Sequence, residues 1–162
     1  MEEILVAPCG MNCNICSVYL AYKHKVKEKG LKLAYCTGCR PRNKQCAFLK
    51  KKCQTQLLLK GEVNYCYECP DFPCERLSRL DRRYAADFKT SWIENLKLIK
   101  ERGIKKFLRS EEEKWKCPEC GGVICCHNSL CYSCGLNRLK NTTNIYGKII
   151  DTENKGHASR RS

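Results

Sequence analysis

Paired cysteines constrain this chain more than any other feature of its sequence. Sixteen of the 162 residues are cysteines, and most of them occur as C-x-x-C pairs. Such pairs are typical of metal ligands, because two sulfurs on one tight turn can reach the same ion. In a short secreted chain the same number of cysteines would indicate disulfides, so the cellular compartment decides between the two interpretations.

The N-terminal sequence favours a reducing compartment. Met1-Glu2-Glu3 is acidic, and only the short apolar run from Ile4 to Ala7 follows it, which is unlike a secretory signal peptide. No apolar stretch approaches the roughly 20 residues that a membrane span needs. We therefore expect a cytoplasmic protein that makes no membrane contact, with reduced thiols available to metal ions.

Four cysteines near the C-terminus have the spacing of a zinc ribbon. Cys117 and Cys120 form one pair, Cys131 and Cys134 form the other, and a glycine follows the second cysteine of each pair. Glycine permits the unusual dihedral angles of such turns, in which backbone N–H groups point at the thiolates. Four sulfurs close a tetrahedron and leave no open position. The pattern therefore predicts one structural metal site.

Three further residues with ligating side chains lie between these two pairs, namely Cys125, Cys126 and His127. One interpretation is an extra, partly open metal site or a reactive thiol pair. We favour small strand residues followed by a polar turn, His127-Asn128-Ser129, because a free cysteine packs as a small hydrophobic residue. Neighbouring residues of a strand would also point to opposite faces.

The N-terminal half holds ten more cysteines, and spacing alone does not assign them uniquely. The simplest first site joins two C-x-x-C pairs: Cys13, Cys16, Cys36 and Cys39. The second site combines the third pair with one cysteine on either side: Cys53, Cys66, Cys69 and Cys74. Two cysteines are left as alternative ligands: Cys9 and Cys46. With the ribbon, this assignment gives about three Zn²⁺ sites, and an iron–sulfur cluster in the N-terminal half is the alternative, since all-cysteine ligation suits both.

Cys9, Cys13 and Cys16 also match the C-x-x-x-C-x-x-C spacing by which radical enzymes hold three irons of a four-iron cluster. Such an enzyme needs a large parallel α/β barrel of about 200 residues or more. Here a lysine-rich segment and another C-x-x-C pair follow instead. Cys13 and Cys16 are therefore better interpreted as half of a closed site, and the role of Cys9 stays open.

The order of the N-terminal motifs resembles a known family. The motifs are Cys9-Gly10-x-x-Cys13-x-x-Cys16, Cys36-x-Gly-Cys39, Cys53 and Cys66-x-x-Cys69-x-x-Phe72-Pro73-Cys74. Over residues 5 to about 80 they resemble a cysteine-rich prokaryotic domain of unknown function that is common in anaerobic archaea and bacteria. The resemblance implies a cytoplasmic, zinc-binding protein and supplies no established reaction. Cys46 departs from the spacing of that family.

The chain is basic, with a formal net charge of +14 when every thiol is counted as neutral. Three zinc sites with four thiolates each would lower this charge to about +8. Between residues 23 and 60, twelve lysines and arginines stand against the single acid Glu28. A basic stretch of this kind can attract phosphate backbones. We favour the simpler interpretation of a solvated face that offsets nearby thiolate charge, because no base-reading element accompanies it.

Helical patterns separate the cysteine motifs. We expect a helix capped by Ser17 that runs to about Lys29, with Val18, Tyr22 and Val26 on its apolar face. A short helix is expected over residues 54–60. Two longer helices are expected between residues 75 and 108, the second starting at a Ser91 capping box and ending near Gly103. Residues 104–108 are expected to form a short turn and residues 110–114 a charged linker.

These elements predict a small α+β fold stapled by metal ions, because the core of such a chain is undersized. We expect a cysteine-rich lobe with two metal sites (1–74), a helical hairpin (75–110), a zinc ribbon (111–140) and a polar, basic tail (141–162).

The inventory of side chains gives little support for an enzyme, and no catalytic residue is assigned. There are three histidines, and the sequence has neither a G-x-x-x-x-G-K phosphate loop nor a G-x-G-x-x-G turn. Our leading hypothesis is a non-catalytic zinc module that binds nucleic acid or a protein partner. The second hypothesis is a redox or metal-handling protein with an iron–sulfur cluster.

Overall fold

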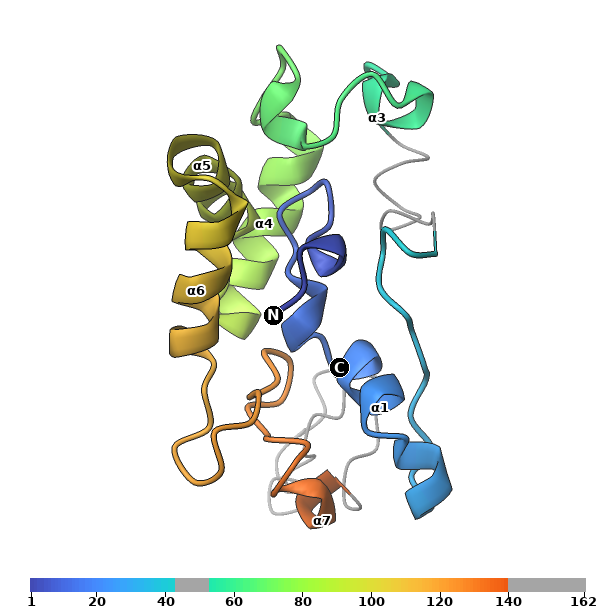
Figure 1. The fold of residues 1–162 in the computed structure, drawn as a ribbon. Coiled ribbons are helices and arrows are strands. Elements are labelled where there is room, and N and C mark those ends of the chain that lie inside the picture. The colour runs from blue at the N-terminus through green and yellow to red at the C-terminus, as the bar shows by residue number, and fades with distance from the viewer. Residues whose placement is uncertain (43–52, 140–162) are drawn as a thin grey trace, which may run out of the picture.

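The computed structural model describes residues 1–42 and 53–139, which form a mainly helical molecule (Figure 1). Cys46 and the tail from residue 141 onward lie outside these ranges. Along the described chain, α-helices and short 3-10 helices (η) occur in this order: η1 (Glu3–Leu5), η2 (Cys13–Ile15), α1 (Ser17–Lys23), η3 (Val26–Lys29), α3 (Leu57–Lys60), η4 (Cys66–Glu68), α4 (Glu75–Phe88), α5 (Trp92–Arg102), α6 (Ile104–Lys114) and α7 (Leu136–Leu139).

Helices α4, α5 and α6 pack against one another on one side of the molecule (Figure 1). The start of α5 agrees with the sequence, because the Ser91 hydroxyl accepts a hydrogen bond from the Glu94 N–H at 3.1 Å. Gly103, with a φ of 80°, ends this helix as expected. The expected turn and charged linker are wrong, since residues 104–114 form the single helix α6. The predicted two-helix hairpin is therefore followed directly by a third helix, α6.

The predicted helix from Ser17 to Lys29 is broken into two pieces. α1 ends at Lys23, and Lys25 adopts a left-handed conformation with a φ of 49° before η3 begins. Ser17 does not cap the helix with its side chain, and its hydroxyl is buried without a hydrogen-bond partner among the described residues. Of the expected apolar face, Val26 is fully buried and Val18 is half-buried, but Tyr22 is not buried. Tyr22 is 45% exposed, and the helix instead buries Tyr19, Leu20 and Ala21.

The segment from residue 5 to residue 15 lies between α5 and the chain around Arg40. Asn95 of α5 donates a side-chain hydrogen bond to the Gly10 carbonyl at 2.9 Å. On the other side, the Arg40 Nε donates to the Val6 carbonyl at 2.6 Å. This central position explains why every residue from 5 to 15 is buried.

The β part of the predicted α+β fold is reduced to isolated bridges within the described chain. They pair Val6 with Asn12, Lys116 with Val123, and Ile124 with Cys131, all antiparallel. The segment 116–131 therefore pairs only at isolated positions and forms no extended strands. Its backbone is fixed mainly by the turns around its cysteines.

The predicted helix over residues 54–60 is only one turn long. Gln56, in a left-handed conformation, precedes α3, and Gly61 ends it. None of the helices formed by residues 1–42 and 53–139 combines the length and the apolar character that a membrane span requires.

Candidate metal centre

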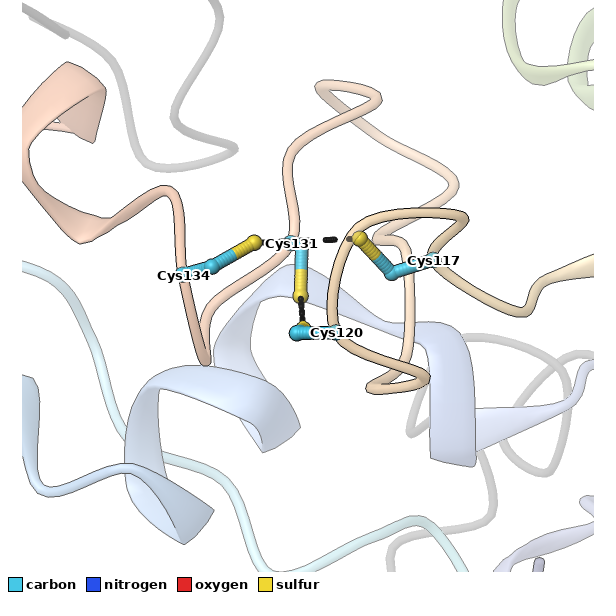
Figure 2. Close-up of side chains that lie close together, drawn as sticks. All are labelled: Cys117, Cys120, Cys131 and Cys134. Carbon is cyan, nitrogen blue, oxygen red and sulfur yellow. Dashed lines mark hydrogen bonds between the residues drawn. The ribbon is translucent and has the colours of Figure 1, made fainter.

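The four cysteines of the predicted ribbon converge on one point. The Sγ atoms of Cys117, Cys120, Cys131 and Cys134 all lie within 4.8 Å of one another. Figure 2 shows the two C-x-x-C turns facing each other, with Cys117 next to Cys134 and Cys120 next to Cys131. The corresponding Sγ–Sγ distances are 3.7 and 3.5 Å. This four-cysteine group can hold a metal ion.

Local backbone hydrogen bonds build the first turn of this site. The Cys117 N–H donates to the Gly122 carbonyl at 2.7 Å, and the Gly121 N–H donates to the Cys117 carbonyl at 2.9 Å. Gly121 has a φ of 72°, which explains the glycine at this position. The Gly122 N–H points at the Cys120 Sγ, 3.4 Å away. The turn thus presents two sulfurs and an N–H group to the same side.

The second turn repeats this construction around Cys131 and Cys134. The Gly135 N–H donates to the Cys131 carbonyl at 2.7 Å. A side chain at position 135 would meet that same carbonyl oxygen at 2.7 Å, so glycine is needed for the close approach. The two turns also fit tightly, because a Cβ at Gly122 would lie 2.7 Å from the Ser133 hydroxyl.

The electrostatics of this site favour a bound cation. Burial raises the pKa of the Cys131 thiol, but the backbone N–H groups of Cys134 and Ser133 and the neighbouring thiols outweigh it and lower the pKa to about 7. The hydrogen bond that the Cys134 thiol donates to Cys120 raises the pKa of Cys134. The Cys131 thiol therefore loses its proton more readily than the Cys134 thiol, and a divalent cation would compete with protons for these sulfurs.

The spacing of the four sulfurs also fits a zinc ion. Zinc–sulfur bonds of about 2.3 Å place the corners of a tetrahedron about 3.8 Å apart. The observed Sγ–Sγ distances of 3.5 and 3.7 Å are close to this edge. Cys117 and Cys131 are buried, whereas Cys120 and Cys134 are exposed, so the site lies at the surface. Four sulfurs would complete the coordination of a zinc ion at this position.

The other predicted ligands are less tightly gathered. Within residues 1–42 and 53–139, no further group of three or more Cys, His, Asp or Glu ligand atoms lies within 4.8 Å of one another. Cys13 and Cys39 are hydrogen-bonded, and this bond together with burial raises the pKa of Cys13. Burial raises the pKa of Cys16 to about 12. The Cys36 Sγ instead accepts a hydrogen bond from Arg42 Nη1 at 3.2 Å.

The second predicted N-terminal set surrounds a single small cavity. Its four sulfur-bearing residues all line this cavity: Cys53, Cys66, Cys69 and Cys74. Of the two alternative ligands, Cys9 is buried in the core next to Trp92 and Leu96. Cys46 lies outside the described residues.

Cys125 and Cys126 are packed inside the molecule, as small hydrophobic residues would be. Their exposed fractions are 0% and 4%, and they belong to different clusters of the core. Burial raises the pKa of Cys125 to about 11 and also raises that of Cys126. Neither thiol has the exposure or the lowered pKa of a reactive cysteine.

His127 is the residue whose role the sequence did not indicate. The expected polar turn would leave it in solvent, but its side chain is only 4% exposed. Its Nδ1 accepts a hydrogen bond from the Ser17 N–H at 3.2 Å, at the start of α1. The rings of Tyr84 and Phe88 pack edge-on against it. These contacts join residues that are distant in sequence, so no local motif could have shown them.

The N-terminal part of the chain matches a known family model. Residues 5–79 match the model of a family described as "Protein of unknown function (DUF3795)". No match was found to a curated protein or to a solved structure. The match agrees with the expected domain of unknown function, and it does not extend to the four-cysteine group at residues 117–134.

Proposed function

We propose that this chain is a zinc-binding module in which Cys117, Cys120, Cys131 and Cys134 hold one structural Zn²⁺ ion. The observation that carries this proposal is the convergence of the four Sγ atoms within 4.8 Å of one another. Four thiolates around Zn²⁺ complete its coordination, so the ion stabilises the fold and does not activate a substrate. The module then acts by binding a partner.

The zinc site is tested by metal analysis of the purified protein and two variants. Cys120→Ser should remove one zinc per chain, because the serine hydroxyl does not replace a thiolate on zinc. Cys126→Ala is the matched control from the same hairpin, and it should retain the wild-type zinc content. Equal zinc contents in the wild type and in Cys120→Ser would overturn the assignment.

The partner that best fits the surface is single-stranded nucleic acid. Five lysines around α1 and η3 are exposed: Lys23, Lys25, Lys27, Lys29 and Lys32. Tyr22 is 45% exposed beside them, and its ring lies edge-on to Tyr35 with a centroid distance of 5.8 Å. Lysines supply the phosphate contacts of such a partner, and an exposed aromatic ring offers a stacking platform for a base.

Binding can be measured by the fluorescence anisotropy of a short, labelled single-stranded RNA at several salt concentrations. Replacing Lys23, Lys25 and Lys29 by alanine should reduce the slope of log Kd against log salt by about 2, because each lost phosphate contact removes about 0.7. The control variant replaces three exposed lysines of α5 and α6: Lys100, Lys105 and Lys106. It should bind like the wild type.

Absence of salt-dependent RNA binding would overturn the nucleic-acid part of the proposal and would favour a protein partner. The same result would leave the zinc site untouched, since the lysines lie outside the four-cysteine group. Iron and sulfide in the metal analysis would instead favour a metal-handling or redox protein.

A further inference from the structure

A small apolar cavity in the N-terminal part of the molecule is lined by four cysteines. It has a volume of about 30 Å³, and almost all of its exposed wall is apolar. The hydrocarbon part of the wall comes from α3, α4 and the loop between them: Leu57, Leu58, Val63, Phe72 and Leu77. Four cysteines also line the cavity: Cys53, Cys66, Cys69 and Cys74. In such a cavity several sulfur ligands face a space where water finds few hydrogen-bond partners.

Independent contacts show that these thiols are close to one another. The Thr55 hydroxyl oxygen lies 3.4 Å from the Cys53 Sγ and 3.7 Å from the Cys69 Sγ. Cys66 and Cys74 line the same cavity as Cys53 and Cys69. The four thiols therefore surround the same small volume.

We propose that Cys53, Cys66, Cys69 and Cys74 bind a second Zn²⁺ ion, independently of the ribbon site. The cavity has room for about two bodies of the size of water, each of which needs about 10 to 15 Å³ of such space. A single ion fits this space.

Two arginines can offset the net charge of −2 that one zinc and four thiolates carry. Arg76 lines the cavity. Arg40 is held beside the residues that precede Cys66, because its guanidinium donates hydrogen bonds to the carbonyl oxygens of Val6 and Asn64 at 2.6 and 2.8 Å. Its guanidinium also lies 4.6 Å from the centre of the Tyr65 ring. One acid, Asp71, lines the cavity as well.

The sulfurs of the second site are farther apart before metal binding than those of the ribbon site. No three of its sulfurs lie within 4.8 Å of one another, whereas all four ribbon sulfurs do. Zinc therefore has to draw the Cys66–Cys74 loop and Cys53 together, and the binding energy stabilises the packing of this loop against Leu77. This closure would hold Cys53 and the Cys66–Cys74 loop against α4.

The experiment compares the zinc content of the wild type, Cys69→Ser, Cys120→Ser and the double variant after anaerobic purification. This inference extends the proposed function but does not depend on the ribbon site. We expect each single variant to lose one zinc per chain and the double variant to lose two. If Cys69→Ser keeps the wild-type zinc content while Cys120→Ser loses one, the second site is wrong and the ribbon site stands. If only Cys69→Ser loses zinc, the ribbon site is wrong and the second site stands.

Cobalt titration of the intact apo protein covers the case in which Cys69→Ser does not fold. Tetrathiolate Co²⁺ has intense visible and thiolate-to-metal charge-transfer bands, and zinc displaces it. In Cys120→Ser, where only the second site is left, one equivalent of Co²⁺ should still produce these bands. Their absence in folded Cys120→Ser, or iron with stoichiometric sulfide in the purified wild type, would overturn the proposal.

Discussion

The backbone N–H of Cys126 donates a hydrogen bond to the carbonyl of Ile15 at 2.9 Å. The adjacent His127 accepts the N–H of Ser17 at 3.2 Å, across 110 residues of sequence. The hairpin between the two ribbon turns is therefore joined to the N-terminal cysteine motif. The part of the chain that matches the family model and the four-cysteine group outside that match form one packed structure.

Replacing His127 by alanine tests this junction. The substitution removes the acceptor of the buried Ser17 N–H and leaves a cavity beside Tyr84 and Phe88. We expect the free energy of unfolding to fall by about 2 to 4 kcal/mol, measured by urea denaturation. The exposed Asn137→Ala should change it by less than about 0.5 kcal/mol. A change equally small in His127→Ala would show that the junction is not stabilising.

Glu111 provides a second test, because its buried carboxylate joins α6 to the N-terminal segment. It accepts hydrogen bonds from Asn12 Nδ2 at 3.0 Å and from Trp115 Nε1 at 3.3 Å. Glu111→Ala leaves both donors in a buried position and should cost about 2 to 4 kcal/mol in thermal or chemical denaturation. Glu113→Ala, an exposed position on the same helix, is the control. Similar stabilities of the two variants would contradict the role given to Glu111.

Gly10 is expected to tolerate no side chain. Its φ is +85°, and a Cβ would lie 2.2 Å from the Trp92 carbonyl oxygen. Gly10→Ala should therefore destabilise the protein by about 3 kcal/mol or more. Gly30 has a similar φ of +81° but open space around it, so Gly30→Ala should cost only about 1 kcal/mol. Equal losses in the two variants would mean that backbone conformation alone, and not the contact with α5, sets the requirement.

The protein should release its zinc as the pH falls. The pKa of Cys131 is lowered from 9.0 to about 7, so its thiolate is present above that pH and is lost as the pH falls through it. Protons compete with zinc for the same sulfurs, so release should increase as the pH falls from about 7 toward about 4. A colorimetric zinc indicator can follow this release. Zinc loss that grew on raising the pH over the same range would contradict thiolate ligation.

The site at residues 117–134 could be predicted because its information is local. Two C-x-x-C pairs with following glycines specify their own turns, and the same applies to the Ser91 cap and the Gly103 stop of α5. The N-terminal cysteines were harder to assign because their partners are set by tertiary contacts. Cys36 lies next to Arg42, whereas Cys13 contacts Cys39.

Tertiary contacts also explain the errors in the helix predictions. The Lys27 N–H donates to the Tyr35 hydroxyl at 2.8 Å, which replaces the bond that a continuous helix from Ser17 would form. Residues 110–114 resemble a linker in composition, but Glu111 has partners in Asn12 and Trp115 that keep it inside α6. A sequence pattern does not contain either of these contacts.

X-ray absorption at the zinc edge of the anaerobically purified protein tests the proposed tetrathiolate zinc site most directly. We predict zinc surrounded by four sulfur atoms at about 2.3 Å, with no nitrogen or oxygen neighbours. Cys69→Ser should keep this all-sulfur environment for the zinc of the ribbon site. Iron with acid-labile sulfide in place of zinc, or zinc bound by nitrogen and oxygen atoms, would contradict the proposal.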